Sequence, residues 1–136
     1  MAVISSEVEN GIRVVWLDRK DALNAFNSDM MDELCEAFLN AAADPFTKVL
    51  VLTGAGRAFS AGADLKAMGA AQAEPKHGLN GLLEAIIDFP KPFIVAIEGA
   101  AIAGGFFPVI CSDYRIAGPH ATFGLAEVRV GVGMPA

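Results

Sequence analysis

Residues 91–117 have the sequence KPFIVAIEGAAIAGGFFPVICSDYRIA, and this stretch decides the fold that we expect. Phe93–Ile97 is a short apolar run behind a proline, which predicts a strand buried on both faces. The pair Gly104-Gly105 follows a run of small residues. Two glycines let the backbone turn sharply and let a ligand approach it closely.

A short helix is expected directly after the glycines, over Phe106–Cys111. Pro108 fits the first turn of such a helix, where its missing N–H breaks no hydrogen bond. The free N–H groups and the positive dipole end of the helix would then face whatever lies over the glycines. Because Tyr114–Ala117 is typical of a strand, the stretch predicts a strand, a glycine turn, a helix and a second strand.

The rest of the chain continues this alternation. Asn10-Gly11 between two apolar runs is the strongest short signal of a β-hairpin. The expected strands are Val3–Val8, Ile12–Leu17, Lys48–Thr53 and the short extended piece Ala121–Gly124, and the expected helices are one beginning near Ser28 and one over Leu79–Ile87. The order of elements indicates an α/β chain in which each strand leads into a helix.

The first long helix has a predicted cap, core face and end. Ser28 is expected to cap it, and acidic residues in the first turn suit the helix dipole. Asp44-Pro45 stops it. The apolar residues at helical spacing, which we expect to pack in the core, are Met31, Leu34, Cys35, Phe38, Ala41 and Ala42.

Composition limits the class of protein. The 136 residues suffice for one domain, which we expect to span residues 1–136. Apolar residues make up 54% of the chain, which favours a large core or a surface that is covered by more protein. The net charge of −6 argues against nucleic acid and against an anionic membrane as partners.

The cysteines and the N-terminus indicate a cytoplasmic protein. Cys35 and Cys111 lie far apart with no histidine beside either, so we expect two buried thiols in a reducing compartment. The N-terminus carries Glu7 and Glu9 and lacks the apolar core of a signal peptide. No spacing of cysteine and histidine suits zinc, so no metal site is expected.

Two glycine-bearing turns, each after a buried strand, carry the candidate chemistry. One is centred on Gly62-Ala63 and the other on Gly104-Gly105. If their strands are neighbours, two backbone N–H groups from different loops converge on one oxygen and form an oxyanion hole without side chains. The alternative is that both are merely tight turns, and the spacing alone leaves the two interpretations open.

The segment Leu52–Lys66, with the sequence LTGAGRAFSAGADLK, resembles the most specific signature of the crotonase (enoyl-CoA hydratase/isomerase) superfamily. The opening turn Leu17–Ala25 and the segments Lys91–Asp113 and Phe123–Gly131 are similar to that family in the same order. The resemblance covers the chain from near its start to its last residue.

The resemblance implies a crotonase-like spiral of ββα repeats that binds an acyl-CoA thioester as substrate, with no cofactor. The backbone N–H groups of Ala63 and Gly104 would hold the thioester oxygen. The residues that would line the CoA side are Ala22, Leu23, Ala61, Asp64, Leu65 and Lys66. This fits the chemistry, because paired N–H groups stabilise the oxygen charge that develops when a thioester loses its α-proton.

Departures from the family pattern favour one reaction type. In hydratases of the family a glutamate stands where this chain has Phe107, whereas the second acid of the family matches Glu127. Ala103 also replaces the first of three glycines. One carboxylate suffices to shuttle a proton and move a double bond, whereas water addition is normally helped by two. We therefore expect an isomerase-like enzyme with Glu127 as acid/base, and Phe107 as core packing or as a wall of an apolar acyl pocket.

Two other interpretations stay open: a hydratase relative that acts through Glu127 alone, and a non-catalytic acyl-CoA-binding subunit. The chain stops at Ala136, whereas members of the resembling family continue into further spiral and a C-terminal helical region, so we expect a truncated chain. The resemblance implies a homotrimer or hexamer for the full-length protein. The high apolar content fits a piece whose partner surface is absent.

Overall fold

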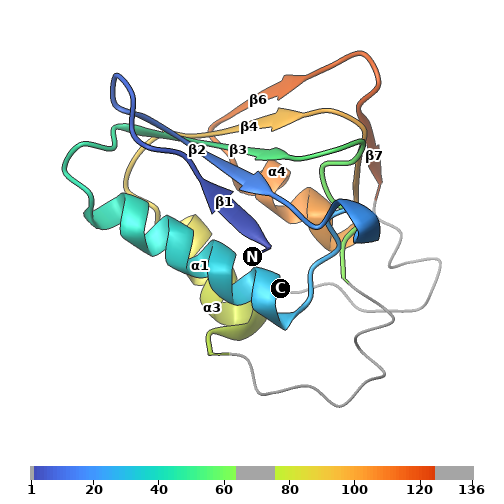
Figure 1. The fold of residues 1–136 in the computed structure, drawn as a ribbon, viewed down its shortest axis with the longest axis horizontal. Coiled ribbons are helices and arrows are strands. Elements are labelled where there is room, and N and C mark those ends of the chain that lie inside the picture. Colours follow the sequence, from blue (N-terminus) through green and yellow to red (C-terminus); the bar gives the residue numbers. More distant parts are fainter. Residues whose placement is uncertain (1, 64–75, 125–136) are drawn as a thin grey trace.

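The computed structural model describes residues 2–63 and 76–124 of the chain. Strands and helices alternate along it (Figure 1), which confirms the α/β class. The elements in chain order are β1 (Val3–Ser5), β2 (Ile12–Leu17), the 3-10 helix η1 (Lys20–Ala22), α1 (Ser28–Ala43), β3 (Val49–Gly54), α3 (Gly78–Ile87), β4 (Phe93–Ile97), β5 (Ala100–Ile102), the 3-10 helix η2 (Ala103–Phe106), α4 (Phe107–Cys111), β6 (Tyr114–Ala117) and β7 (Thr122–Gly124). Among the helices of the described residues, none is long and apolar enough to cross a membrane.

The main sheet has the strand order β1-β2-β3-β4-β6. β1 pairs antiparallel with β2, whereas β2, β3, β4 and β6 run parallel to one another. Leu17 at the end of β2 lies opposite Gly54 at the end of β3, and Ile97 at the end of β4 lies opposite Ala117. The segments that follow β2, β3 and β4 therefore leave the sheet at the same carboxyl edge.

The predicted hairpin between β1 and β2 is confirmed. Asn10 and Gly11 have φ angles of 54° and 81°, the positive values that a two-residue turn between twisted strands requires. β1 is shorter than the predicted Val3–Val8. The Ser6 N–H still donates to the Val14 carbonyl at 2.8 Å, but the Val14 N–H donates to the Ser6 hydroxyl at 2.9 Å. The side chain of Ser6 thus replaces one backbone acceptor of the ladder, where β1 ends.

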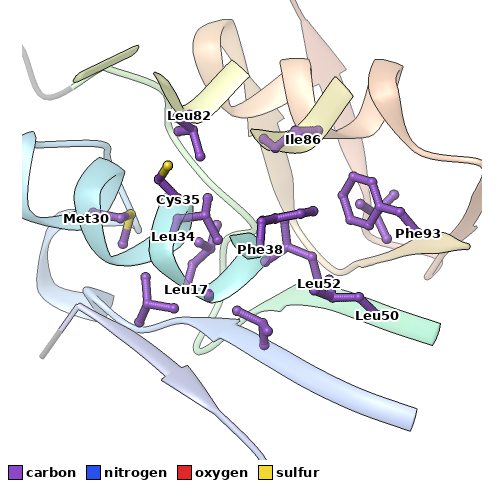
Figure 2. Packing of buried hydrophobic residues seen from close by; sticks show 14 of the residues in the cluster. Leu17, Met30, Leu34, Cys35, Phe38, Leu50, Leu52, Leu82, Ile86 and Phe93 are labelled. Atoms are coloured by element: carbon purple, nitrogen blue, oxygen red, sulfur yellow. The ribbon is translucent and has the colours of Figure 1, made fainter. Parts of the chain in front are cut away.

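Helices α1 and α3 contact each other on one face of the main sheet (Figure 1). Phe38 of α1 is fully buried and makes edge-on ring contacts with Phe89 and Phe93, at centroid distances of 5.3 and 5.0 Å. Such contacts orient the helix layer on the sheet. Figure 2 shows the labelled core side chains that point toward one another from α1, α3 and the strands: Leu17, Met30, Leu34, Cys35, Leu50, Leu52, Leu82 and Ile86.

The predicted core face of α1 is confirmed for Leu34, Cys35, Phe38 and Ala41, which are all buried. Met31 packs only partly against the core and Ala42 is half-buried. Met30, which was not predicted, is fully buried, so the buried stripe is shifted by one residue at the start of the helix.

The predicted cap of α1 is wrong by one residue. Asn27 is the N-cap, and its side chain accepts the Met30 N–H at 2.9 Å. Ser28 is the first helical residue. Asparagine and serine are almost equally good caps, so the sequence alone could not choose between these neighbours.

β4 and the elements after it follow the prediction with three differences. Phe93, Val95 and Ile97 are buried but the residues between them are half-buried, so only one face of β4 is fully covered. The helix after the glycine pair begins at Phe107, is five residues long and carries Pro108 in its first turn. η2 precedes it and was not predicted.

A second, two-stranded sheet of β5 and β7 was also not predicted. The two strands pair in parallel, with Ala101 opposite Phe123. Ala101 is paired as well with Ser60, in the segment that follows β3. β5 therefore joins β7 to the segment that follows β3. Its own three small or aliphatic residues give little signal for a strand.

A polar cluster closes the opposite, amino edge of the sheet. Asp44, the predicted end of α1, accepts hydrogen bonds from the Phe46 N–H (3.0 Å), the Thr47 hydroxyl (2.7 Å) and the Arg13 guanidinium (2.9 Å). These three donors, in that order of importance, lower the pKa of Asp44 from 3.8 to about 2. The charged form of Asp44 therefore stabilises the folded chain.

We predict that Asp44→Asn removes an acid-sensitive part of the stability. Because the folded-state pKa lies below the unfolded one, the carboxylate contributes its full stabilisation above about pH 4 and loses it as the pH falls toward 2. The free energy of unfolding of the parent should exceed that of the variant near neutral pH, and the difference should vanish near pH 2. Urea unfolding at a series of pH values measures it.

Asp21→Asn is the matched control, because Asp21 is an exposed carboxylate in η1 and does not belong to the Asp44 cluster. Its substitution should change the free energy of unfolding little over the same series of pH values. A difference between the parent and Asp44→Asn that stays constant from neutral pH to pH 2 would contradict the prediction.

Candidate active site

Five of the predicted site residues, Ala22, Leu23, Ala61, Ala63 and Gly104, lie on segments that leave the carboxyl edge of the main sheet. Residues 18–26 follow β2, residues 55–63 follow β3 and residues 98–106 follow β4. In open α/β sheets, ligands bind at this edge. The three segments are joined by hydrogen bonds, and these bonds define the geometry of the candidate site.

Asn24 joins the first two segments and is fully buried. Its Nδ2 donates to the carbonyls of Ala55 (2.9 Å) and Ala58 (2.8 Å), and its Oδ1 accepts the Arg19 N–H at 2.8 Å. Its φ of 55° lies in the left-handed region, where asparagine is several-fold enriched. A buried amide with these partners fixes the turn after β2 against the segment after β3.

Three of the predicted CoA-side residues come together at this junction. The Ala61 N–H donates to the Leu23 carbonyl at 3.0 Å, and Ala22, the last residue of η1, directly precedes Leu23. All three residues are half-buried. The structure thus places them side by side, whereas their contact with CoA stays a prediction.

The second and third segments pair through an isolated parallel bridge between Ser60 and Ala101. The Ser60 N–H donates to the Ala100 carbonyl, and the Ile102 N–H donates to the Ser60 carbonyl, each at 3.0 Å. Because the bridge is parallel, the backbones after Ser60 and after Ala101 continue in the same direction. Ala63 and Gly104 each follow their member of the bridge by three residues.

The peptide unit that carries the Ala63 N–H has a fixed orientation. Its carbonyl, that of Gly62, accepts the Phe26 N–H at 2.7 Å. The described residues contain no cis peptide bond, and in a trans peptide the N–H and the C=O point in opposite directions. The Ala63 N–H therefore points away from Phe26, and Ala63 itself is exposed.

Gly104 is the second residue of η2. The first N–H groups of a helix have no acceptor within it, so an acceptor for the Gly104 N–H has to come from outside η2. Ala103, immediately before it, has a φ of 56°. This value lies in the region that favours glycine, so the alanine that replaces a glycine of the resembling family is strained in this chain.

Phe107 is the first residue of α4 and is half-buried. The neighbouring ring of Phe106 contacts Phe123 of β7 at a centroid distance of 5.7 Å. At the position where the resemblance implies a glutamate in hydratases, this chain therefore has an apolar side chain and no group that can ionise.

Four predicted site residues lie outside the described residues: Asp64, Leu65, Lys66 and Glu127. The first three follow Ala63 directly, and Glu127 comes three residues after β7. Their roles in CoA binding and proton transfer stay predictions.

A hollow of about 290 Å³ between α1 and α3 is lined by none of the predicted site residues. Cys35 and His77 both line it, but burial raises the pKa of the Cys35 thiol, and the carboxylates of Asp32 and Glu36 raise it further. The thiol therefore stays protonated and is a poor nucleophile. Both cysteines are free, and the predicted burial holds for Cys35 but only partly for Cys111.

Asp32 beside this hollow has a structural role. Its carboxylate accepts the backbone N–H groups of Lys76 (2.8 Å), His77 (2.8 Å) and Gly78 (3.4 Å) at the start of α3. Burial opposes ionisation of this carboxylate, but the three donors outweigh burial and lower its pKa. Within residues 2–63 and 76–124, no group of three or more His, Cys, Asp or Glu side chains is arranged to hold a metal ion.

A family-wide sequence pattern matches almost the whole chain. The model of the enoyl-CoA hydratase/isomerase family matches residues 7–136. The chain belongs to this family. The resemblance to the crotonase superfamily is thereby confirmed.

Curated members of the enoyl-CoA hydratase/isomerase family match most of the chain. It is 35% identical over 131 residues to a crotonyl-CoA hydratase from Syntrophomonas wolfei, covering 93% of this chain and 50% of that protein. It is 39% identical over 123 residues to a carnitinyl-CoA dehydratase from Salmonella arizonae, covering 87% and 46%. The chain thus spans about half the length of these relatives.

Solved structures of the family share the fold. An enoyl-CoA hydratase from Mycobacterium marinum superimposes with a TM-score of 0.89 at 33% identity, over 98% of this chain and 64% of that one. An enoyl-CoA hydratase/carnithine racemase from Magnetospirillum magneticum gives a TM-score of 0.89 at 31% identity, over 100% and 53%. The predicted crotonase fold is confirmed.

Sequence reasoning missed the two side chains that hold the site segments together. Asn24 and Ser60 both stand within the crotonase-like motifs, but no role was predicted for either. Both are fully buried, and the Ser60 hydroxyl donates to the Asn24 carbonyl at 2.8 Å. A lone polar residue among small and apolar neighbours after a buried strand was the available signal, since such a residue needs hydrogen-bond partners when it is buried.

We predict that Ala103→Gly raises the free energy of unfolding by up to about 1 kcal/mol. A left-handed alanine costs about 1–2 kcal/mol. Glycine relieves that strain but loses about 0.5–1 kcal/mol through the extra freedom of the unfolded chain, so a small net gain remains. Denaturant unfolding of the parent and the variant measures the difference.

Ala101→Gly provides the control, because Ala101 is fully buried in β5 and has no positive φ. Glycine there adds unfolded-state freedom and relieves no strain, so stability should fall. Equal losses of stability in the two variants would show that the backbone at position 103 is not strained.

Proposed function

We propose that the protein acts on an acyl-CoA thioester and stabilises the enolate oxygen of that thioester with the backbone N–H groups of Ala63 and Gly104. The parallel bridge between Ser60 and Ala101 is the main support for this proposal, because Ala63 follows Ser60, and Gly104 follows Ala101, by three residues each. Membership of the enoyl-CoA hydratase/isomerase family supports the class of substrate.

Removal of a proton beside the thioester carbonyl puts negative charge on the carbonyl oxygen. Two N–H dipoles aimed at that oxygen stabilise the charge as it develops, and a backbone that is already in place needs no reorganisation. The hydrogen bonds of Asn24 and the bond from Phe26 to Gly62 provide such rigidity. Loss of one donor of this kind costs about 10²–10³ in kcat.

Glu127 is proposed as the acid/base of an isomerisation that moves a C3–C4 double bond to C2–C3. Its carboxylate would take the proton from one carbon and return it to the other. Phe107 supports this choice of reaction, because a phenyl ring cannot activate water at the position where hydratases of the family have a glutamate.

Hydration or dehydration through Glu127 alone is the second candidate. The relatives from Syntrophomonas wolfei and Salmonella arizonae are a hydratase and a dehydratase, which favours this reaction type. The same pair of N–H donors serves both candidates, since both pass through a thioester enolate. They differ in whether water enters the site.

The CoA moiety is proposed to lie along the junction of the first two carboxyl-edge segments. The hydrogen bond from Ala61 to Leu23 supports this place, because it brings together Ala22, Leu23 and Ala61 next to Ala63. Asp64, Leu65 and Lys66 would extend the same surface.

We predict that Glu127→Gln lowers the exchange of the thioester α-proton by about a hundredfold or more, because general acid–base groups contribute about 10²–10⁴ to such rates. The exchange is measured in the intact protein with deuterated water and followed by mass spectrometry of the thioester. Exchange at the parent rate in the variant would show that another group, such as Asp64 or Glu98, is the base.

The parent and a second variant complete this test. The parent should exchange the α-proton and convert 3-enoyl thioesters faster than it hydrates 2-enoyl thioesters. Phe107→Glu should raise water addition, because it supplies the missing carboxylate. A parent that binds the thioester without any exchange would be a non-catalytic binding subunit, and a parent that mainly hydrates would favour the second candidate.

We also propose that the intact protein is a homotrimer or hexamer. Large apolar side chains that are exposed on the described surface support this: Phe46 is 75% exposed, Ile87 68% and Tyr114 64%. Apolar surface of this kind is covered in many assemblies. Light scattering is expected to give the mass of a trimer or hexamer, and a compact monomer that binds no hydrophobic dye would contradict the proposal.

A further inference from the structure

The geometry points to Ser60 as a positioning residue that sets the two proposed oxyanion donors, the N–H groups of Ala63 and Gly104, at a fixed separation. This inference rests on the function proposed above. Ser60 is fully buried, and its position next to the bridge with Ala101 places it between the two turns that carry the donors.

Every polar group of Ser60 has a partner on a site segment. Its N–H and C=O bond Ala100 and Ile102, at 3.0 Å each. Its hydroxyl donates to the Asn24 carbonyl at 2.8 Å and accepts the Gly62 N–H at 3.1 Å. One residue thus binds the segment after β2, the turn before Ala63 and the strand before η2.

The hydroxyl acts directly on the turn that presents the Ala63 N–H. Gly62 lies between two peptide units, and each is held by one bond. The Ser60 Oγ holds the N–H of the first unit, and the Phe26 N–H holds the C=O of the second. Gly62 has a φ of 89°, which glycine adopts freely, so these two bonds and not local sterics fix its conformation.

The backbone of Ser60 acts on the other donor. The Ser60 carbonyl accepts the Ile102 N–H. Ile102 is the last residue of β5 and precedes Gly104 by two residues. A Cβ built on Gly105 would lie 2.6 Å from the Ser60 carbonyl oxygen and 2.7 Å from the Ser60 Cβ. Gly105 therefore packs against Ser60 with no room for a side chain, and this contact sets how closely the Gly104 turn approaches the Ala63 turn.

The test is Ser60→Ala in the intact protein, with α-proton exchange and thioester binding measured separately. The variant loses the acceptor for the Gly62 N–H and the donor to the Asn24 carbonyl, but it keeps the backbone bridge and the backbone bond from Ala61 to Leu23. We therefore expect Ala63 to shift more than the proposed CoA surface does. We expect kcat for exchange to fall about tenfold to a hundredfold, since a misplacement of about 1 Å costs about 10² in rate. KM should change less than about threefold, because the donors act on charge that develops in the transition state.

Two further variants separate positioning from a loss of stability. Ser60→Cys keeps a weak donor and acceptor and should give a kcat between those of the parent and Ser60→Ala. Thr47→Val is the matched control: Thr47 is also a buried hydroxyl that donates and accepts side-chain bonds, but it lies at the amino edge. It should lower the melting temperature and leave kcat of the folded enzyme unchanged.

The possible outcomes are distinct. A kcat for Ser60→Ala equal to that of an active parent, or a kcat loss that Thr47→Val shares, overturns the positioning role and leaves the proposed function intact. If Ser60→Ala does not fold, Ser60→Cys decides, and a parent-like kcat there overturns the role. A parent that shows no α-proton exchange overturns the proposed function and this inference together.

Discussion

Backbone that leaves the carboxyl edge of the sheet must find hydrogen-bond partners, and the rest of the structure depends on how it does so. A buried N–H or C=O without a partner costs about 1–3 kcal/mol. Strand ladders supply the partners up to Leu17 and Gly54, and then they stop. Beyond that point the partners come from backbone bonds between the three segments, from the Asn24 amide and from the Ser60 hydroxyl. The groups that permit folding at this edge are therefore the same groups that shape the candidate site.

The amino edge has a different task. There Asp44 gathers donors from Arg13 and Thr47, and the Lys91 ammonium donates to the carbonyls of Ala41 and Asp44 at 2.7 Å each. These bonds fasten the end of α1 to the starts of the strands. With one edge fixed in this way and the helix layer packed on the sheet, the turns at the other edge extend from a rigid support, which a site made of backbone dipoles requires.

The sequence predicted what periodicity and turn chemistry encode. Alternation and the Asn10-Gly11 pair gave the hairpin, the apolar stripe gave the core face of α1, and Asp44-Pro45 gave its end. β5 could not be predicted, because its strand character comes from pairing with distant residues. The cap at Asn27 was missed because propensity does not separate it from Ser28.

The candidate site was predicted in outline, through the two glycine turns and the family motifs. The bonds that join those turns depend on the approach of three segments in space, and spacing along the chain does not contain this information. Asn24 is an example: its left-handed φ and its three amide bonds are visible only once β2 and β3 lie side by side. The roles of Asp64 and Glu127 lie outside the described residues and stay predictions.

The outer position of β6 has a consequence for how this protein behaves in solution. β6 pairs with β4 on one side, and no strand of the described residues pairs with its other side. All four of its residues are exposed, and Tyr114 and Ile116 are large and apolar. A strand edge that nothing covers is a template for pairing with another chain. Resistance to aggregation therefore depends on what shields β6, and it can be lost while the core remains fully folded.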